Sequence, residues 1–170
     1  MPSRVVVLDT SVLCCLLRVP GKDQAGPIGD RWTHDRIRVL LDQEQLRGST
    51  FVLPLASIIE TGNHIANAPG ERYQIAQTFC GYLSAAANSA SPWAAFGDQQ
   101  DLWSRDGLVK LAQTWPALAA GGLSIGDTTI KEVADYYARS GAYVQILTGD
   151  QGLKAYEPAL PVVKPRRRQR

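Results

Sequence analysis

Four acidic residues lie in sequence contexts that are more typical of a functional site than of an ordinary solvated surface. Asp9 and Asp150 each follow a short run of apolar residues. Such runs are typical of buried strands in a parallel sheet, and open α/β sheets bind ligands at the carboxyl ends of their strands. Asp127 lies at the start of a helical pattern, and Glu60 follows two isoleucines in another, where a buried carboxylate without a partner is costly. The sequence therefore presents four candidates for one shared site.

Each acid also has a simpler interpretation as a helix cap or a surface residue. Aspartate is common at N-caps, and Asp9 directly precedes a helical pattern that Thr10 or Ser11 can also cap. Ser124 and Asp127 have the spacing of a capping box. A single acid decides nothing, but the joint placement of four favours a site.

Apolar runs and turn residues divide the chain into alternating strands and helices. A loop is expected over 21–29, and Asp30 is expected to cap the helix that follows it. This alternation favours a single α/β domain over residues 1–163, with a three-layer sandwich in which a central parallel sheet is flanked by helices. Strands are predicted at 5–8, 50–53, 143–147 and 162–163, and helices at about 12–17, 31–45, 54–66, 71–89, 98–118 and from 123 past 137.

Several apolar residues are expected to mark the core-facing sides of these helices. In the helix over 54–66 they are Leu55, Ile58, Ile59 and Ile65. In the helix over 98–118 they are Leu102, Leu108, Leu111 and Trp115. The three cysteines, Cys14, Cys15 and Cys80, lack zinc-type spacing and are expected to be reduced core thiols.

The composition is that of an ordinary globular protein, with 45% hydrophobic and 20% charged residues. The sequence runs almost at once into its first predicted strand, so we expect no signal peptide. No apolar run approaches the length of a membrane span. With cysteines expected to be reduced, these features predict a cytoplasmic protein.

The charge is unevenly distributed. The net charge is +2, but residues 164–170 hold five of the 18 basic residues and none of the 16 acidic ones, so the rest carries 13 − 16 = −3. A basic arm of this kind suits an anionic polymer such as RNA, and it is also compatible with a merely solvated end. The candidate RNA-binding residues in this tail are Arg166, Arg167, Arg168 and Arg170.

The four acids and their surroundings resemble the PIN-domain family and, within it, the VapC-type toxin ribonucleases of bacterial toxin–antitoxin pairs. The first and last of the matching motifs are the most specific, and together the motifs span most of the chain. They are Val7-Leu8-Asp9-Thr10-Ser11-Val12-Leu13, Ile58-Ile59-Glu60, Ile125-Gly126-Asp127-Thr128-Thr129-Ile130 and Ile146-Leu147-Thr148-Gly149-Asp150.

This resemblance implies an endoribonuclease that depends on Mg²⁺ or Mn²⁺, with an antitoxin partner and a homodimeric state. It implies that Asp9, Glu60, Asp127 and Asp150 are both the catalytic residues and the metal ligands. Further residues are expected to support them: Thr10 and Ser11 through their hydroxyl groups, Asn63 on the same helix face as Glu60, and Lys131, which can pair with Asp127 or contact a phosphate.

Physical chemistry agrees with a cation at such a site. Two carboxylates 4 Å apart repel each other by about 4 kcal/mol at an effective dielectric constant of about 20. A divalent cation removes this repulsion, and magnesium prefers carboxylate oxygens and water as ligands. From the sequence alone, Asp9→Asn is expected to abolish cleavage and, without divalent ions, to raise the melting temperature.

Other functions remain possible at this point. A PIN-like module that binds RNA or a protein without cutting is the main alternative. Phosphatases that use an aspartate after the first strand need a second aspartate where Ser11 stands, and receiver domains need an acidic pair near the chain start. A zinc site built on Glu60 and His64 is weakly supported, because His34 is the only other histidine.

Overall fold

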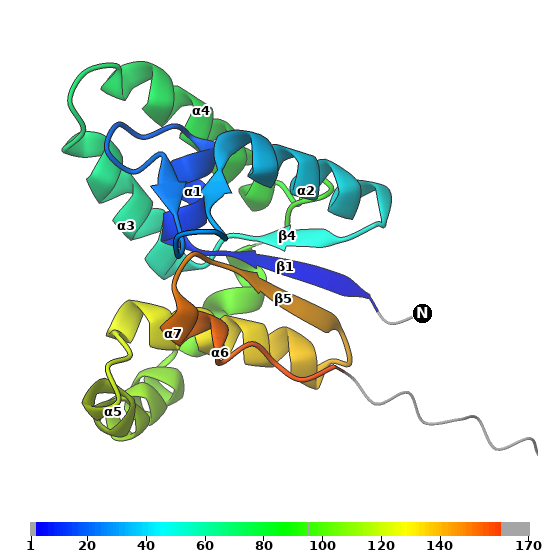
Figure 1. Cartoon of the computed structure of the whole chain (residues 1–170). Coiled ribbons are helices and arrows are strands. Elements are labelled where there is room, and N and C mark those ends of the chain that lie inside the picture. Colours follow the sequence, from blue (N-terminus) through cyan, green and yellow to red (C-terminus); the bar gives the residue numbers. More distant parts are fainter. Residues whose placement is uncertain (1–2, 95, 161–170) are drawn as a thin grey trace, which may run out of the picture.

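The computed structural model describes residues 3–94 and 96–160, and it has a parallel sheet with helices on both faces (Figure 1). Within these residues the sheet consists of β1 (Arg4–Leu8), β4 (Thr50–Val52) and β5 (Tyr143–Leu147). The order is β4-β1-β5, and both pairings are parallel, so β1 is the central strand. The predicted α/β class, with a parallel sheet flanked by helices, is confirmed. The strand predicted at 162–163 and the basic tail lie outside the described residues.

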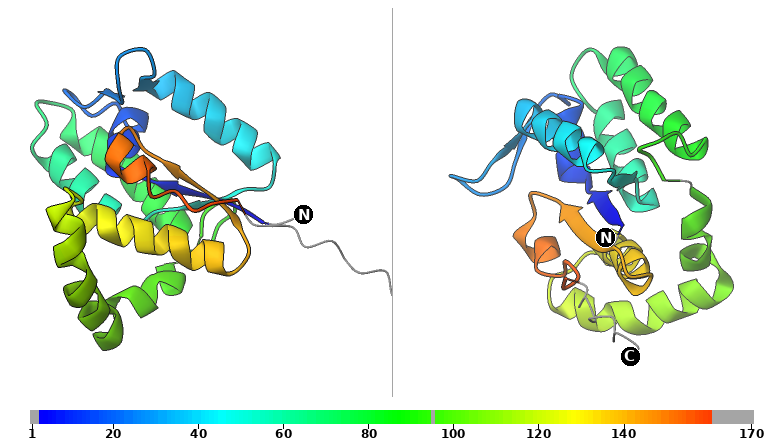
Figure 2. Two further views of the ribbon diagram at one scale, coloured as in Figure 1. Left: turned by 60° about the horizontal axis from the view of Figure 1, so that its bottom comes forward. Right: turned by 90° about the vertical axis from the view of Figure 1, so that its right-hand side faces the viewer.

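Helices cover the sheet in two groups. Figure 1 shows α1 to α4 on one side of the sheet and α5 to α7 on the other, and both views in Figure 2 show α5 far from α2. No helix in the described ranges is both long and apolar enough to cross a membrane. The bounds are α1 (Thr10–Leu16), α2 (His34–Leu46), α3 (Leu55–Ala66), α4 (Arg72–Ala87), the 3₁₀ helix η1 (Phe96–Trp103), α5 (Arg105–Ala120), α6 (Ile125–Arg139) and α7 (Gln151–Lys154).

The alternating side chains of β1 supply two separate cores. Val6 and Leu8 pack with residues of α1 and α2 on one face. Val5 and Val7 pack with residues of α6 on the other face. All four are buried, and each such side chain contributes roughly 1.5–3 kcal/mol of transfer free energy. Burial on both faces holds β1 rigidly, and therefore also the acid that follows it.

The helix predicted after Asp30 begins later, at His34, which corrects the sequence interpretation. A two-stranded antiparallel ribbon, β2 (Gln24–Ala25) and β3 (Trp32–Thr33), keeps the preceding residues extended. Thr33 is the N-cap of α2, and its hydroxyl accepts a hydrogen bond from the main-chain nitrogen of Arg36 at 3.4 Å. The Asp30 carboxylate instead pairs with the Arg36 guanidinium at 2.7 Å. Long-range pairing of β2 with β3 thus overrides the local capping signal.

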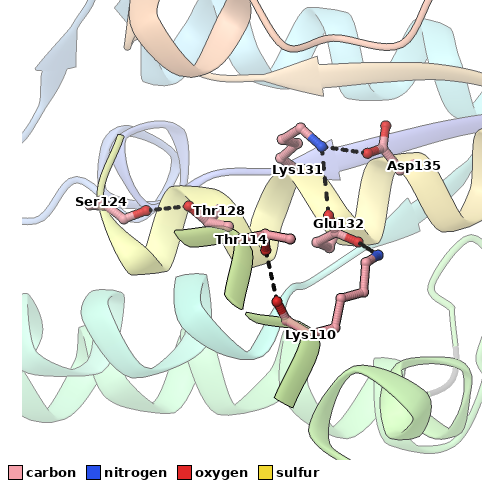
Figure 3. Close-up of polar contacts among 7 residues, drawn as sticks. All are labelled: Lys110, Thr114, Ser124, Thr128, Lys131, Glu132 and Asp135. Carbon is pink, nitrogen blue, oxygen red and sulfur yellow. Dashed lines mark hydrogen bonds and ion pairs between the residues drawn. The ribbon is translucent and has the colours of Figure 1, made fainter. Parts of the chain in front are cut away.

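The single helix predicted over 98–118 is two elements, η1 and α5. Ser104 separates them, because its hydroxyl donates to the Asp101 carbonyl at 2.8 Å and accepts from the Gly107 nitrogen at 3.1 Å. None of the residues of α5 is buried, and the predicted core residue Leu108 is exposed. Leu111, Trp115 and Leu118 form a half-buried apolar stripe on α5, and the ion pair between Lys110 and Glu132 at 2.8 Å adds a polar contact with α6 (Figure 3).

Two further core predictions are wrong. Leu55 and Ile59 of α3 are exposed, the latter by 54%, because this helix buries the stripe Ser57, Thr61 and Ile65 instead. Small side chains on that stripe allow α3 to pack closely, which hydrophobicity alone does not reveal.

The cysteine prediction holds for two of the three residues. Cys14 and Cys15 are buried, and all three thiols are free, but Cys80 is exposed. Burial raises the pKa of the Cys14 thiol to about 12 and that of the Cys15 thiol to about 11. Both buried thiols are therefore protonated and unreactive at neutral pH.

Candidate active site

Asp9 is the most firmly held of the four acids. It follows β1, and its main-chain nitrogen donates to the Leu147 carbonyl of β5 at 3.1 Å. Its Oδ1 accepts from the Thr10 nitrogen at 2.6 Å. Its Oδ2 accepts from the Ser11 hydroxyl at 2.6 Å, the Thr148 hydroxyl at 2.8 Å and the Ser11 nitrogen at 3.3 Å. Asp9 itself, rather than Thr10 or Ser11, is therefore the N-cap of α1. The side chain is oriented by four donors and has spare acceptor capacity on Oδ1.

The turn between β5 and α7 is tied to the same carboxylate. The Thr148 hydroxyl, which donates to Asp9, accepts from the Asp150 nitrogen at 2.9 Å. The Ser11 hydroxyl accepts from the Gly149 nitrogen at 3.0 Å. Asp150 caps α7 through Oδ1, which accepts from the Gly152 nitrogen at 2.6 Å. Its Oδ2 has no hydrogen bond to any residue in the described ranges, so one oxygen remains available for a ligand.

Glu60 links α3 to the starts of two other helices. It is exposed rather than buried, which corrects the expectation from its apolar neighbours. Its Oε2 accepts from the Thr10 hydroxyl at 2.9 Å. Its Oε1 lies so close to Gly126 of α6 that a Cβ atom on that glycine would be 2.5 Å from it. Gly126 thus leaves the room into which the Glu60 carboxylate fits.

Asp127 stands in the first turn of α6 and is half-buried. Ser124 is the N-cap, and its hydroxyl accepts from the Asp127 nitrogen at 3.0 Å and donates to the Asp127 Oδ2 at 2.7 Å. The predicted capping arrangement is therefore present. Burial raises the pKa of the Asp127 carboxyl above 3.8, the Ser124 hydrogen bonds oppose this, and the charges of Asp9 and Asp150 raise it further.

All four acids line one cleft of about 320 Å³ at the carboxyl edge of the sheet. They reach it from β1, α3, α6 and the β5–α7 turn, which are far apart in the sequence. No three His, Cys, Asp or Glu side chains within residues 3–94 and 96–160 stand close enough to form a ready-made metal site. The remaining lining residues are Thr10, Ser11, Cys14, Lys22, Gln24, Ala25 and His64.

The structure separates two predicted supporting residues from this cleft. Asn63 lines an apolar groove between α3 and α4. Lys131 pairs with Asp135 at 2.6 Å and with Glu132 at 3.6 Å, and Figure 3 shows its side chain directed away from the helix start at Ser124. The pairing of Lys131 with Asp127 is therefore not present. A lysine with an acid four residues later on the same helix already has a partner within reach.

Sequence reasoning missed three residues at the cleft. Thr148, which orients Asp9, belongs to the same Thr-Gly-Asp motif as Asp150 and was recognisable from that motif. Lys22 and Gln24 also line the cleft; Gln24 belongs to the β2–β3 ribbon, and Lys22 lies two residues before it. The Trp32 indole nitrogen anchors this ribbon by donating to the Thr148 carbonyl at 2.9 Å. No local pattern in the sequence predicts the hydrogen bond between Trp32 and Thr148.

Asp127→Asn is expected to raise the free energy of unfolding at pH 7 in the presence of a chelator. The folded-state pKa of Asp127 is raised, so stability falls as the pH rises above the unfolded value of 3.8, and the loss is complete once the pH exceeds the folded value. Asparagine resembles the neutral acid, and the gain should therefore shrink as the pH falls towards about 3.8 and below. Denaturant unfolding of the native protein and the variant at pH values from 7 to below about 3.8 measures this gain in the free energy of unfolding. Asp42→Asn, at an exposed position of α2, is the control, and an equal gain there would contradict the explanation.

Comparison of the chain with protein-family models, curated proteins and solved structures finds no match.

Proposed function

We propose that this protein is a divalent-metal-dependent endoribonuclease. The observation that carries the proposal is the gathering of four carboxylates from four separate chain segments in one cleft. Folding concentrates negative charge there, and such a concentration is costly unless a cation or substrate chemistry compensates it. Helix capping alone would bring Asp9 and Asp150 to this edge of the sheet, but it does not account for Glu60, which lies within α3 and not at its N-cap.

The donor set fits Mg²⁺ or Mn²⁺. Hard divalent cations prefer carboxylate oxygens, and the ligands would be Asp9, Glu60, Asp127 and Asp150. Burial is the main reason that the pKa of Asp127 is raised, and the charges of Asp9 and Asp150 add a repulsion that a cation would relieve. When bound, such an ion supplies Lewis acidity towards the phosphodiester and makes water a better nucleophile.

The protein's own residues prepare the cleft for this chemistry. The donors around Asp9 fix its carboxylate and leave Oδ1 with spare acceptor capacity. Thr10 holds one oxygen of Glu60 and leaves the other beside Gly126. These contacts orient Asp9 and Glu60 before any ligand binds. Among the described residues no three acids stand close enough to hold one ion, so binding a shared ion would draw the acids closer together. No separate nucleophilic side chain is required.

RNA as the substrate, a toxin role with an antitoxin partner and a homodimeric state are proposed from the resemblance to PIN-domain toxins. A cytoplasmic location is proposed from the free cysteines. The arginines of the basic tail are proposed to assist RNA binding, and they lie outside the described residues. A module that binds RNA without cutting is the alternative that the experiment must separate.

Incubation of the purified full chain with single-stranded RNA tests the proposal. Cleavage is expected with Mg²⁺ or Mn²⁺, and none is expected with a chelator. The Asp9→Asn protein, prepared identically, controls for contaminating nucleases. RNA that is bound but remains uncut in either metal would show the non-cutting module to be correct, and cleavage that persists in the variant would refute the assignment of Asp9.

Gly126→Ala is expected to lower cleavage about tenfold while leaving the protein at least as stable. The new methyl group would displace the flexible Glu60 carboxylate, and a shift of about 1 Å at a reacting group can cost up to about 100-fold. In a helix, alanine is favoured over glycine by roughly 0.5–1 kcal/mol. Steady-state kinetics and thermal unfolding measure the two effects. In the control, Gly81→Ala, the new Cβ meets nothing within 4 Å, and activity should be retained.

A further inference from the structure

Lys22 is a cation in an otherwise acidic cleft. It lines the same hollow as the four acids and is the only lysine or arginine among the described lining residues. Its main chain is fixed just after α1, because its nitrogen donates to the Val19 carbonyl at 2.9 Å and its carbonyl accepts from the Cys15 thiol at 3.5 Å. The backbone therefore holds Lys22 at the rim of the cleft, while its side chain stays exposed.

The Lys22 ammonium is also unpaired. It makes no ion pair or hydrogen bond with any residue in the described part of the chain, although four carboxylates line the same cleft. The other lysines of that part, Lys110, Lys131 and Lys154, each pair with a carboxylate. An unpaired ammonium beside four acids is free to receive an anion from outside.

The sum of the formal charges in the cleft is consistent with the binding of one such anion. Four carboxylates and Lys22 sum to −3. If two divalent cations were bound, they would bring the sum to +1. One phosphodiester group then neutralises the cleft. Without Lys22 the same two ions would give zero, so the attraction of the cleft for an entering phosphate would be weaker.

We propose that Lys22 binds a backbone phosphate of the RNA strand that occupies the cleft. This inference rests on the proposed function, because it takes RNA as the ligand and the four acids as the cation site. Lysine suits the task as a compact point charge on a flexible stem, able to follow a phosphate without a fixed bidentate geometry. Lys22 is thus a substrate-binding residue and not a structural counter-charge.

The test uses the full chain with Lys22→Met, which keeps the length and removes the charge, and Lys22→Arg, which restores it. Arg38→Met is the matched control, because Arg38 is an exposed cation of α2 that does not line the cleft. Fluorescence anisotropy with a labelled single-stranded RNA decamer in Mn²⁺ measures the affinity, in an Asp9→Asn background that prevents cleavage. Calorimetric titration of the protein with Mn²⁺ alone, without RNA and with Asp9 intact, measures cation binding.

Lys22→Met is expected to weaken RNA binding about fivefold. It should also reduce the slope of log affinity against log salt concentration by about 0.7. Lys22→Arg should recover most of the affinity, and Arg38→Met should change neither quantity. Mn²⁺ alone should bind Lys22→Met more tightly than the native protein, because a like charge has been removed. In the cleaving protein, KM should rise more than kcat falls.

The outcomes separate this inference from the proposed function. If Lys22→Met binds RNA as well as its parent, or loses no more affinity than Arg38→Met, the phosphate contact is overturned even when the native protein cleaves RNA. If the native protein cleaves no RNA but Lys22→Met selectively loses RNA affinity, the contact stands and hydrolysis is the part that fails.

Discussion

Asp9→Asn is expected to lose at least about 100-fold in RNA cleavage, since even a residue that only supports a metal ligand is typically worth 10–100-fold. The same change is expected to lower stability by about 1–2 kcal/mol. Asp9 accepts hydrogen bonds on both oxygens, including one from the Thr10 nitrogen and one from the Ser11 nitrogen. Whichever oxygen becomes an amide NH₂ group, it will face a main-chain N–H that it cannot accept from.

This result reverses an expectation based on the sequence alone. Repulsion among the acids predicts that neutralising Asp9 raises the melting temperature. The donors around Asp9 already stabilise its charge, so the relief of repulsion is expected at Asp127 instead. Activity assays and denaturant unfolding of Asp9→Asn, beside Asp42→Asn, check both parts. A variant as active as the native protein removes the catalytic assignment, and a more stable variant shows that repulsion outweighs the hydrogen bonds.

Glu44→Gln is expected to cost about 3 kcal/mol of stability without changing the activity of the folded protein. The Glu44 side chain is 3% exposed and joins α2 to the beginnings of two strands. It accepts from the Arg4 guanidinium at 3.0 and 3.1 Å and from the Ser49 hydroxyl at 2.5 Å, and it pairs with Arg47 at 2.7 Å. Arg4 and Arg47 are partly exposed, so water can solvate their charges once the Glu44 charge is removed. The loss of stability is therefore expected at the lower end of the range for breaking a buried ion pair.

The cost should depend on pH in a defined direction. Burial alone would raise the pKa of Glu44, but hydrogen bonds from Arg4, Ser49 and Arg47 outweigh it and hold the pKa below 4.5. A carboxyl group whose pKa is lower in the folded protein than in the unfolded chain stabilises the fold at pH values above its unfolded pKa. This stabilisation is lost as the pH falls through its folded-state pKa. The difference between native protein and variant should therefore be full at pH 7 and shrink below about pH 4.5. Urea unfolding measures it, with Glu71→Gln as an exposed control. A difference independent of pH would assign the loss to packing.

The sequence predicted the features that depend on residues close together in the chain, and it did not predict those that depend on long-range contacts. The strand before Asp9 was recognisable because burial on two faces selects continuous apolar residues, and the strand before Asp150 because only Gln145 interrupts its apolar residues. The capping of α6 by Ser124 was recognisable because it involves neighbours three residues apart. The start of α2 was not recognisable from the sequence, because the pairing of β2 with β3 overrides the local capping signal of Asp30. The break at Ser104 was missed because a continuous helical pattern runs through it.

For the candidate site, residue types and order were sufficient to propose the four acids, because Asp9 and Asp150 follow strands, Asp127 opens a helix and Glu60 lies in a helix with a clear hydrophobic pattern. Only the tertiary structure determined that they share a cleft, that Thr148 and Ser11 both hold Asp9, and that Gly126 makes room for Glu60. It also directed Lys131 towards Asp135 and brought Lys22 to the cleft. The physical reason is that hydrophobic periodicity and capping act between near neighbours, whereas these contacts join residues up to 139 positions apart and form only when the elements pack.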